Sequence, residues 1–251
     1  MRKRKMHRII RKSHRYLGLV FGIQFLFWTI GGLYFSWTDI KQIRGEDIRK
    51  NNPPLLLESS SASLSQIISR LKANKPVDHI ETVQLAEVLG KTYYQVSYHD
   101  ASGMKIQLAD AETGELRPPL TEQEAIAVAN SRLLQSADVV RTEYLKHTSG
   151  QHEYREKPLP AYAITYGGKV NTTVYVSAEA GTVQSFRNNR WRIFDFLWML
   201  HTMDYENRDN INNWLLRIFS AFGLVLIISG LALYTISYKK SKIKPQAFNT
   251  F

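Results

Sequence analysis

Two long apolar stretches lie near the ends of the sequence, and polar and apolar residues alternate between them. Residues 16–37 contain no charge and one strongly polar residue, Gln24, and residues 214–237 carry a single charge, Arg217, in their first turn. At about 1.5 Å per residue, a helix of the first stretch rises roughly 33 Å and one of the second roughly 36 Å, enough to cross a hydrocarbon core of about 30 Å. The sequence therefore predicts two transmembrane helices. The first is too long for a cleaved signal peptide, and no A-x-A site follows it.

The region between the spans contains an internal repeat. Residues 93–98 (YYQVSY) resemble residues 161–166 (AYAITY), and residues 105–114 resemble residues 172–181, at an offset of 67 or 68 residues. Both pieces alternate polar and apolar side chains, which is typical of half-buried strands. Each copy ends in an x-A-E-x-G segment, where glycine favours a turn.

Each copy also begins with a helix signal. In the first copy, apolar residues follow a serine run at helical spacing, and in the second, Thr121 and Glu124 have the spacing of a capping box. Further strands are expected at residues 80–86 and 139–146. Each unit is therefore predicted to be a helix followed by about three antiparallel strands. The predicted fold class is α+β, a membrane protein with two transmembrane helices and a tandem extracytoplasmic domain.

The predicted organisation has eight parts. They are a cytoplasmic basic tail (1–15), the first span (16–37), a linker (38–60), the first repeat unit (61–117), the second repeat unit (118–187), an interfacial aromatic helix with its connector (188–213), the second span (214–237) and a second cytoplasmic basic tail (238–251).

The net charge of +11 is concentrated at the two ends of the chain. Residues 1–15 hold eight of the 33 Lys and Arg residues and residues 238–251 hold four, which leaves 21 bases beside all 22 acids in between. A nucleic-acid-binding domain would instead spread basic residues over a folded face, so no nucleic-acid partner is expected. Basic flanks mark the cytoplasmic side of a membrane protein. Both termini are therefore expected in the cytoplasm, and residues 38–213 outside it. The chain has no cysteine, which excludes disulfides, thiolate metal sites and a cysteine nucleophile.

Several short motifs resemble those of a known family. Residues 120–125 (LTEQEA) and 174–181 (VYVSAEAG) resemble the opening helix and the closing strand of a PepSY domain. Residues 14–20 (HRYLGLV), residues 200–203 (LHTM) and Ser229-Gly230 resemble the PepSY-associated transmembrane family. The resemblance implies a bacterial inner-membrane protein. It also implies a role in iron–siderophore use or periplasmic reduction, with haem carried by membrane histidines, or a role like that of the inhibitory propeptide modules of secreted peptidases.

Two histidines are candidate axial ligands for haem b. Gly18 and Gly22 follow His14 on the same helical face and would let a flat macrocycle approach the backbone, although the same spacing equally suits helix–helix packing. His201 lies in an aromatic segment, residues 192–205, that is expected to form a helix at the outer membrane face. By topology the two histidines are about a membrane thickness apart, so one chain cannot hold one haem with both. A homodimer could pair each histidine with its counterpart.

The other histidines and the acidic residues are expected to be ordinary surface groups. His147 and His152 lie in a predicted loop, and His79 and His99 are isolated in the sequence. The acids of the two repeat turns, Glu179 among them, are expected to be solvated. No metal site and no catalytic residue is predicted, because the hydrolase and phosphate-binding motifs are missing; any activity would be haem-mediated reduction.

Three functions remain open from the sequence. The first is an accessory or haem-bearing component of iron or siderophore utilisation or of periplasmic reduction. The second is a membrane-anchored module that docks or inhibits a secreted peptidase or another periplasmic partner. The third is a structural partner in a larger membrane complex, assembled in the lipid bilayer through Gly18, Gly22 and Gly230.

Overall fold

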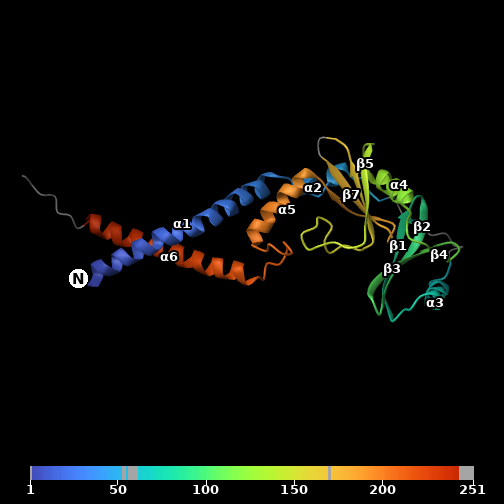
Figure 1. Cartoon of the computed structure of the whole chain (residues 1–251), viewed down its shortest axis with the longest axis horizontal. Helices are drawn as coiled ribbons and strands as arrows, with labels where there is room; N and C mark the ends of the chain where they lie inside the picture. Colours follow the sequence, from blue (N-terminus) through green and yellow to red (C-terminus); the bar gives the residue numbers. More distant parts are fainter. Residues whose placement is uncertain (1, 53–54, 56–61, 169–170, 243–251) are drawn as a thin grey trace, which may run out of the picture. The chain divides into compact units, whose positions relative to one another are not determined.

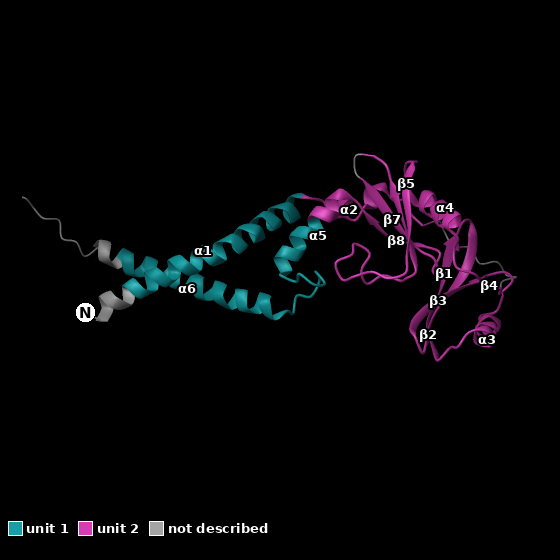
Figure 2. Ribbon diagram, in the orientation of Figure 1, with its two compact units in different colours: residues 1–37, 194–251 teal, residues 38–193 magenta. Residues whose placement is uncertain are grey.

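The computed structural model describes residues 2–52, 55, 62–168 and 171–242, with side chains described between residues 8 and 238. It divides into two compact units, drawn in different colours in Figure 2. Unit 1 consists of residues 1–37 and 194–251, and unit 2 consists of residues 38–193. Each unit is held together by contacts among its own residues.

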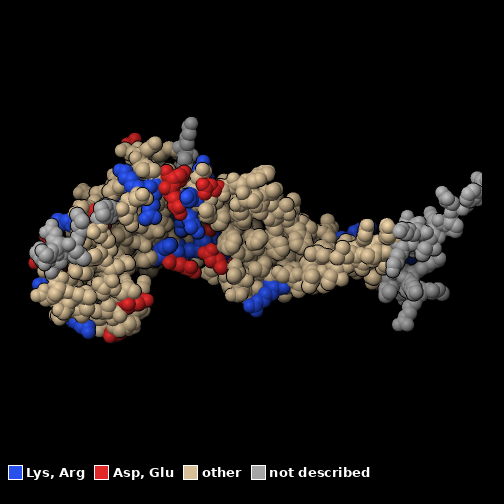
Figure 3. Space-filling model, turned by 180° about the vertical axis from the view of Figure 1, so that it is seen from behind, with Lys and Arg blue, Asp and Glu red and all other residues tan. Residues whose placement is uncertain are grey.

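Unit 1 contains the two long apolar helices, α1 (Arg2–Trp37) and α6 (Trp214–Lys242) (Figure 1). The stretches Arg8–Trp37 and Trp214–Tyr238 are long and apolar enough to cross a membrane, and only 17% and 6% of their most apolar parts are buried within the protein. A core helix of a soluble protein would bury most of that surface. Figure 3 shows few charged atoms along these helices, as a lipid-facing surface requires. Both predicted spans are confirmed as helices.

The first helix begins earlier than expected. The segment 1–15, predicted as a basic tail, is helical from Arg2 onward. The physical reason is that lysine and arginine are good helix formers and that no glycine or proline occurs before Gly18. The apolar span and its basic flank therefore form one continuous helix.

Aromatic side chains hold the two long helices together. The Phe21 ring lies 4.6 Å from the Phe219 ring and 5.4 Å from the Phe222 ring, measured between centroids. Gly223 allows Phe25 to approach α6, because a Cβ at Gly223 would lie 3.1 Å from the Phe25 ring. The contact between α1 and α6 is therefore a packed interface.

The end of a third helix, α5 (Asn189–Thr202), also packs on α1 within unit 1. Gln24 donates a hydrogen bond to the Leu200 carbonyl at 2.7 Å, and Trp28 donates to the same oxygen at 3.3 Å. The last carbonyls of a helix have no partner within the helix, so these two side chains cap α5. Gln24 therefore pairs with a carbonyl of α5 that has no partner within its helix.

Unit 2 contains two antiparallel sheets of four strands each, which confirms the predicted α+β repeat. The first sheet has the order β1-β2-β3-β4 and the second β5-β6-β7-β8. The elements of unit 2 before α5 are α2 (Ile40–Ile43), the 3-10 helix η1 (Glu46–Ile48), α3 (Leu64–Asn74), β1 (His79–Val88), β2 (Lys91–Asp100), β3 (Gly103–Asp110), β4 (Leu116–Arg117), α4 (Glu122–Arg132), β5 (Val139–Leu145), β6 (Ala161–Tyr166), β7 (Thr172–Ser177) and β8 (Val183–Arg187). Three strands per unit were expected; β4 and β8 are the additions, and both are too short to show a periodic pattern.

Both helices of the repeat begin with the same local device. Ser63 and Gln66 form a capping box at the start of α3, and Thr121 and Glu124 form the predicted one at the start of α4. In each case the two residues satisfy each other's free backbone N–H groups. The buried apolar side chains of α3 and α4 then pack each helix against one face of a sheet.

The two sheets share one hydrophobic core. Helix α3 covers one face of the first sheet through Ile67 and Leu71, both fully buried. The opposite face contributes Val88 and Leu108 to the core of α4 and the second sheet. The turn after β7 contacts that face at Gly181, where φ is +69° and a Cβ would lie 2.8 Å from both Val88 and Leu108. The repeat units are therefore packed as one body.

Candidate functional site

His14 lies on α1 against α6, in the interface between the two long helices. Its Nδ1 is 2.8 Å from the Ser229 hydroxyl, and its Cε1 would be 3.2 Å from a Cβ at Gly230. The glycine therefore makes room for the imidazole edge. Ser229 in turn donates to the Leu226 carbonyl at 2.8 Å.

These contacts suit one tautomer of His14. A serine hydroxyl has one hydrogen, and when Ser229 gives it to Leu226, its oxygen can accept the proton of Nδ1. In that tautomer Nε2 has a free lone pair, the state that a metal ligand needs. Gly18 and Gly22, one and two turns further along α1, have no atom within 4 Å of an added Cβ, so their surface is open.

His201 lies near the end of α5 with its side chain exposed. Between ring centroids, His201 is 5.5 Å from Trp28, 6.0 Å from Trp198 and 6.3 Å from Phe35. The rings of His201 and Trp198 are stacked. Trp28 is fourteen residues after His14 on α1, which corresponds to about 21 Å along the helix. The structure does not bring the two predicted ligands together.

The residues present fit one half of a haem site. His14 offers an oriented nitrogen, and Gly18 and Gly22 offer open backbone beside it. Among the described residues, no group of three or more His, Cys, Asp or Glu residues converges on a common point.

A buried ion pair orders the segment that follows His201. Arg208 is paired with Asp195, whose side chain is 4% exposed. Asp204 accepts backbone N–H groups from three residues of the loop, and Thr202 donates to the Arg208 carbonyl at 3.0 Å. Met203, with φ of +54°, ends α5. Sequence reasoning missed this cluster, because it joins residues of α5 to an irregular loop that has no periodic pattern.

Two histidines that looked isolated in the sequence lie together in unit 2. The rings of His79 and His99 are stacked with their centroids 4.6 Å apart. A carboxylate oxygen of Glu81 lies 3.2 Å from Nε2 of His99. The antiparallel register places residue 79 opposite residue 99, which their separation in the sequence does not reveal. The side chains of the pair remain on an exposed strand end.

The predicted surface loop around His152 is packed on the second sheet. Tyr154 is fully buried and stacks on Tyr175 at 4.7 Å, and Tyr175 donates to Glu153 at 2.7 Å. Arg192 pairs with Glu153 at 2.8 Å. Burial, and then the charge of Glu153, raises the pKa of the Tyr175 hydroxyl above its ordinary value of 10.0. This loop is therefore held in place by a buried network.

Glu179, expected to be solvated, is half-buried in the turn between β7 and β8. Burial raises the pKa of its carboxyl above the ordinary 4.5, while the Ile106 N–H and the charges of Lys105 and Lys75 act in the opposite direction. The turn carries Glu179 toward β3 because Gly181 next to it contacts the first sheet.

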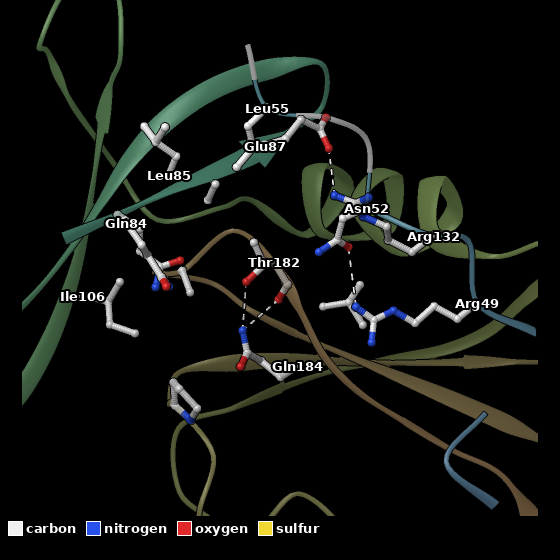
Figure 4. Close-up of a pocket in the computed structure, with 15 residues that line it drawn as sticks. Arg49, Asn52, Leu55, Gln84, Leu85, Glu87, Ile106, Arg132, Thr182 and Gln184 are labelled. Carbon is white, nitrogen blue, oxygen red and sulfur yellow. Dashed lines mark hydrogen bonds and ion pairs between the residues drawn. The ribbon is translucent and has the colours of Figure 1, made fainter. Parts of the chain in front are cut away.

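A cavity of about 400 Å³ lies in unit 2 where the two sheets diverge (Figure 4). The first sheet contributes Gln84, Gln95 and Ile106, and the second contributes Thr182 and Gln184; Arg49, Asn52, Glu87 and Arg132 lie at one end. Arg132 and Glu87 form an ion pair of 2.8 Å with both side chains largely buried. The volume is within the range of about 300–1,000 Å³ that is usual for ligand sites. Sequence reasoning gave no signal for it, since glutamines on strands are ordinary surface residues.

Comparison with known proteins gives one match. Residues 11–251, almost the whole chain with both membrane helices and the body between them, match the family model described as the PepSY-associated TM region. No curated protein and no solved structure matches the chain.

Proposed function

Because the chain belongs to the PepSY-associated transmembrane family, we propose that it is a bacterial inner-membrane protein whose two helices anchor an extracytoplasmic binding body. The basic start of α1 supports this orientation: Arg8, Arg11, Lys12 and Arg15 line one recess, where they would meet the anionic phosphates of the cytoplasmic leaflet. At the other ends of the spans, Trp37 and Trp214 are 84% and 70% exposed, as interfacial tryptophans are.

The observation that carries the binding function is the cavity between the two sheets. Its walls come from both repeat units, and Gly181 keeps the sheets in contact beside it. Ligand sites are concave recesses in which a few placed polar side chains fix the orientation of the ligand. The partner in this proposal is extracytoplasmic, and a secreted peptidase is one candidate.

Photocrosslinking in living cells tests this function. A photoreactive amino acid at Gln84, at the edge of the cavity, should give a discrete adduct with an extracytoplasmic protein or peptide. The matched control is the same substitution at Ser102, in the exposed turn between β2 and β3. Identical adduct patterns at the two positions, or none at either, would contradict a binding role for the cavity.

A second function is supported by the geometry of His14. We infer that the protein serves iron or siderophore utilisation, or periplasmic reduction, by holding haem b at His14, with the second ligand supplied by another copy in a homodimer. Haem would supply one-electron transfer. In this role Ser229 orients the imidazole and Gly18 and Gly22 make space for the macrocycle; His201 is the corresponding candidate at the outer face.

A haem spectrum tests this second function. Protein expressed with ample haem and purified in detergent should show a Soret band that His14→Ala weakens strongly and Ser229→Ala shifts or weakens. His147→Ala, in the loop of unit 2, is the control and should leave the band unchanged. A colourless wild-type protein would rule out the haem role.

A further inference from the structure

We propose that the cavity between the two sheets binds a short segment of polypeptide in extended conformation. The inference rests on the proposed binding function and names the ligand class for the same site. Its starting point is the set of glutamine side chains on the cavity walls, Gln84, Gln95 and Gln184.

Gln95 is the residue whose situation calls for a ligand. It is 7% exposed, it lines the cavity, and no described residue forms a hydrogen bond with its side-chain amide. The Gln95 amide is open to the cavity and is not sealed in the core, so a ligand in the cavity can pair with it. An amide has both a donor and an acceptor, so its best complement is a group with both.

The neighbouring walls have the same chemistry. Gln184 donates to the hydroxyl and carbonyl of Thr182 at 2.9 and 3.3 Å, and both bonds use its Nε2, which leaves Oε1 as an acceptor. By register Gln84 lies directly opposite Gln95 on the neighbouring strand. The buried charges at the end of the cavity, Glu87 and Arg132, neutralise each other. Arg49 at the same end keeps its positive charge, so the site favours a ligand that is rich in amides and not cationic.

The position of the cavity at two sheet edges selects a main chain over other amide-bearing ligands. Strand β1 is at the edge of the first sheet and β8 is at the edge of the second, and both line the cavity. Edge strands present backbone N–H and C=O groups at the repeat of an extended chain, and only a peptide matches that repeat. An N-acetylated sugar would satisfy the glutamines but not the strand edges.

Along β1 and β3, side chains that are buried in the core give way to side chains that line the cavity. Ala86 and Val88 are buried on the face of β1 that also carries Gln84, and Leu108 is buried two residues beyond Ile106. The apolar ends of these strands join the shared core, and the ends with Gln84 and Ile106 face the cavity. The recess is therefore built by the same strands that fix the two sheets together.

The test uses the full chain in lipid nanodiscs and an equimolar pool of N-acetylated, C-amidated hexapeptides of mixed sequence. Retained peptides are quantified by mass spectrometry against empty nanodiscs. The wild type should enrich a subset of peptides, and Gln95→Leu should bind them about ten-fold more weakly. Gln123→Leu, an exposed glutamine on α4, is the matched control and should bind like the wild type.

Folding is followed in parallel by the melting temperature. Gln95→Leu removes an amide that opens to the cavity and forms no hydrogen bond with a described residue, so it should not lower the melting temperature. Gln184→Leu provides a second variant with the same expected loss of binding. Equal retention by the wild type and both cavity variants would overturn the proposal, as would no retention above empty nanodiscs. Displacement of the peptides by an N-acetylglucosamine tetramer would overturn it in favour of a sugar ligand. If adducts form at Gln84 in cells while no peptide is retained, only the ligand class falls and the binding function stands.

Discussion

Replacing Gly181 with alanine would test how the two repeat units are joined. The substitution adds a single methyl group in the turn between β7 and β8, at a residue with φ of +69°. That methyl group would lie 2.8 Å from side-chain carbons of Val88 and Leu108, which are both about 2% exposed. Both neighbours belong to the shared core, so neither can move freely.

The expected cost has two parts. A non-glycine residue in the left-handed region costs about 1–2 kcal/mol, and overpacking a well-packed core costs about 1–3 kcal/mol more. Gly181→Ala should therefore reduce the free energy of unfolding by about 2–5 kcal/mol. Gly90→Ala is the matched control: φ there is +84° and no atom lies within 4 Å of an added Cβ, so it carries only the backbone part.

Thermal unfolding of the full chain in detergent, followed by far-ultraviolet circular dichroism, measures the difference. For a body of this size each kcal/mol corresponds to about 2–4 °C, so Gly181→Ala should melt about 2–12 °C below Gly90→Ala. Equal melting temperatures for the two variants would refute the close contact between the turn and the first sheet. The shared core would then have to be reconsidered.

Two other predictions concern a buried acid and a polar residue between the helices. The pKa of Glu179 is raised, so its protonated form favours the folded state, and that contribution is complete below pH 4.5 and is lost as pH rises through the folded pKa. Between pH 4 and pH 7, the melting temperature of Glu179→Gln should therefore rise relative to that of the wild type. The melting temperature of Glu112→Gln, at the equivalent exposed position of the first repeat, should not rise relative to the wild type. Gln24→Leu should destabilise unit 1 by about 0.5–1.5 kcal/mol in detergent melts, because it removes one of two hydrogen bonds to the Leu200 carbonyl. Leu19→Ala, 70% exposed on the lipid side, is its control, and an equal loss from both variants would show that the hydrogen bond contributes nothing.

Periodic features of the fold could be predicted from the sequence. The spans follow from uninterrupted apolar stretches, and the tandem body follows from the repeat of alternating segments and from the capping box at Thr121. These signals are local, since each depends on residues close together in the chain. The strands β4 and β8 have two and five residues, too few to produce a pattern.

Contacts between distant residues could not be predicted. The stacking of His79 on His99 depends on the hairpin between β1 and β2, whose turn places Leu89 and Gly90 at φ of +53° and +84°. Leucine is not a turn residue, so the register was invisible in the sequence. The ion pair of Asp195 and Arg208 likewise depends on an irregular loop.

The candidate site shows the same division. The sequence identified His14 and Gly230 separately, but their contact and the hydroxyl of Ser229 belong to the packing of α1 on α6. The cavity depends on how two sheets diverge, which no single strand encodes. Its glutamines become notable only because Gln95 is buried without a partner in the described part of the chain.

Cysteine labelling shows on which side of the membrane the two helices hold the tandem body. The chain has no cysteine, so Ala101→Cys, in the turn between β2 and β3, and Lys12→Cys, near the start of α1, each introduce a single thiol. In spheroplasts, a membrane-impermeant maleimide should label Ala101→Cys at once and Lys12→Cys only after the membrane is opened. Labelling of Lys12→Cys alone in intact spheroplasts, or release of the protein from membranes by carbonate, would contradict the account.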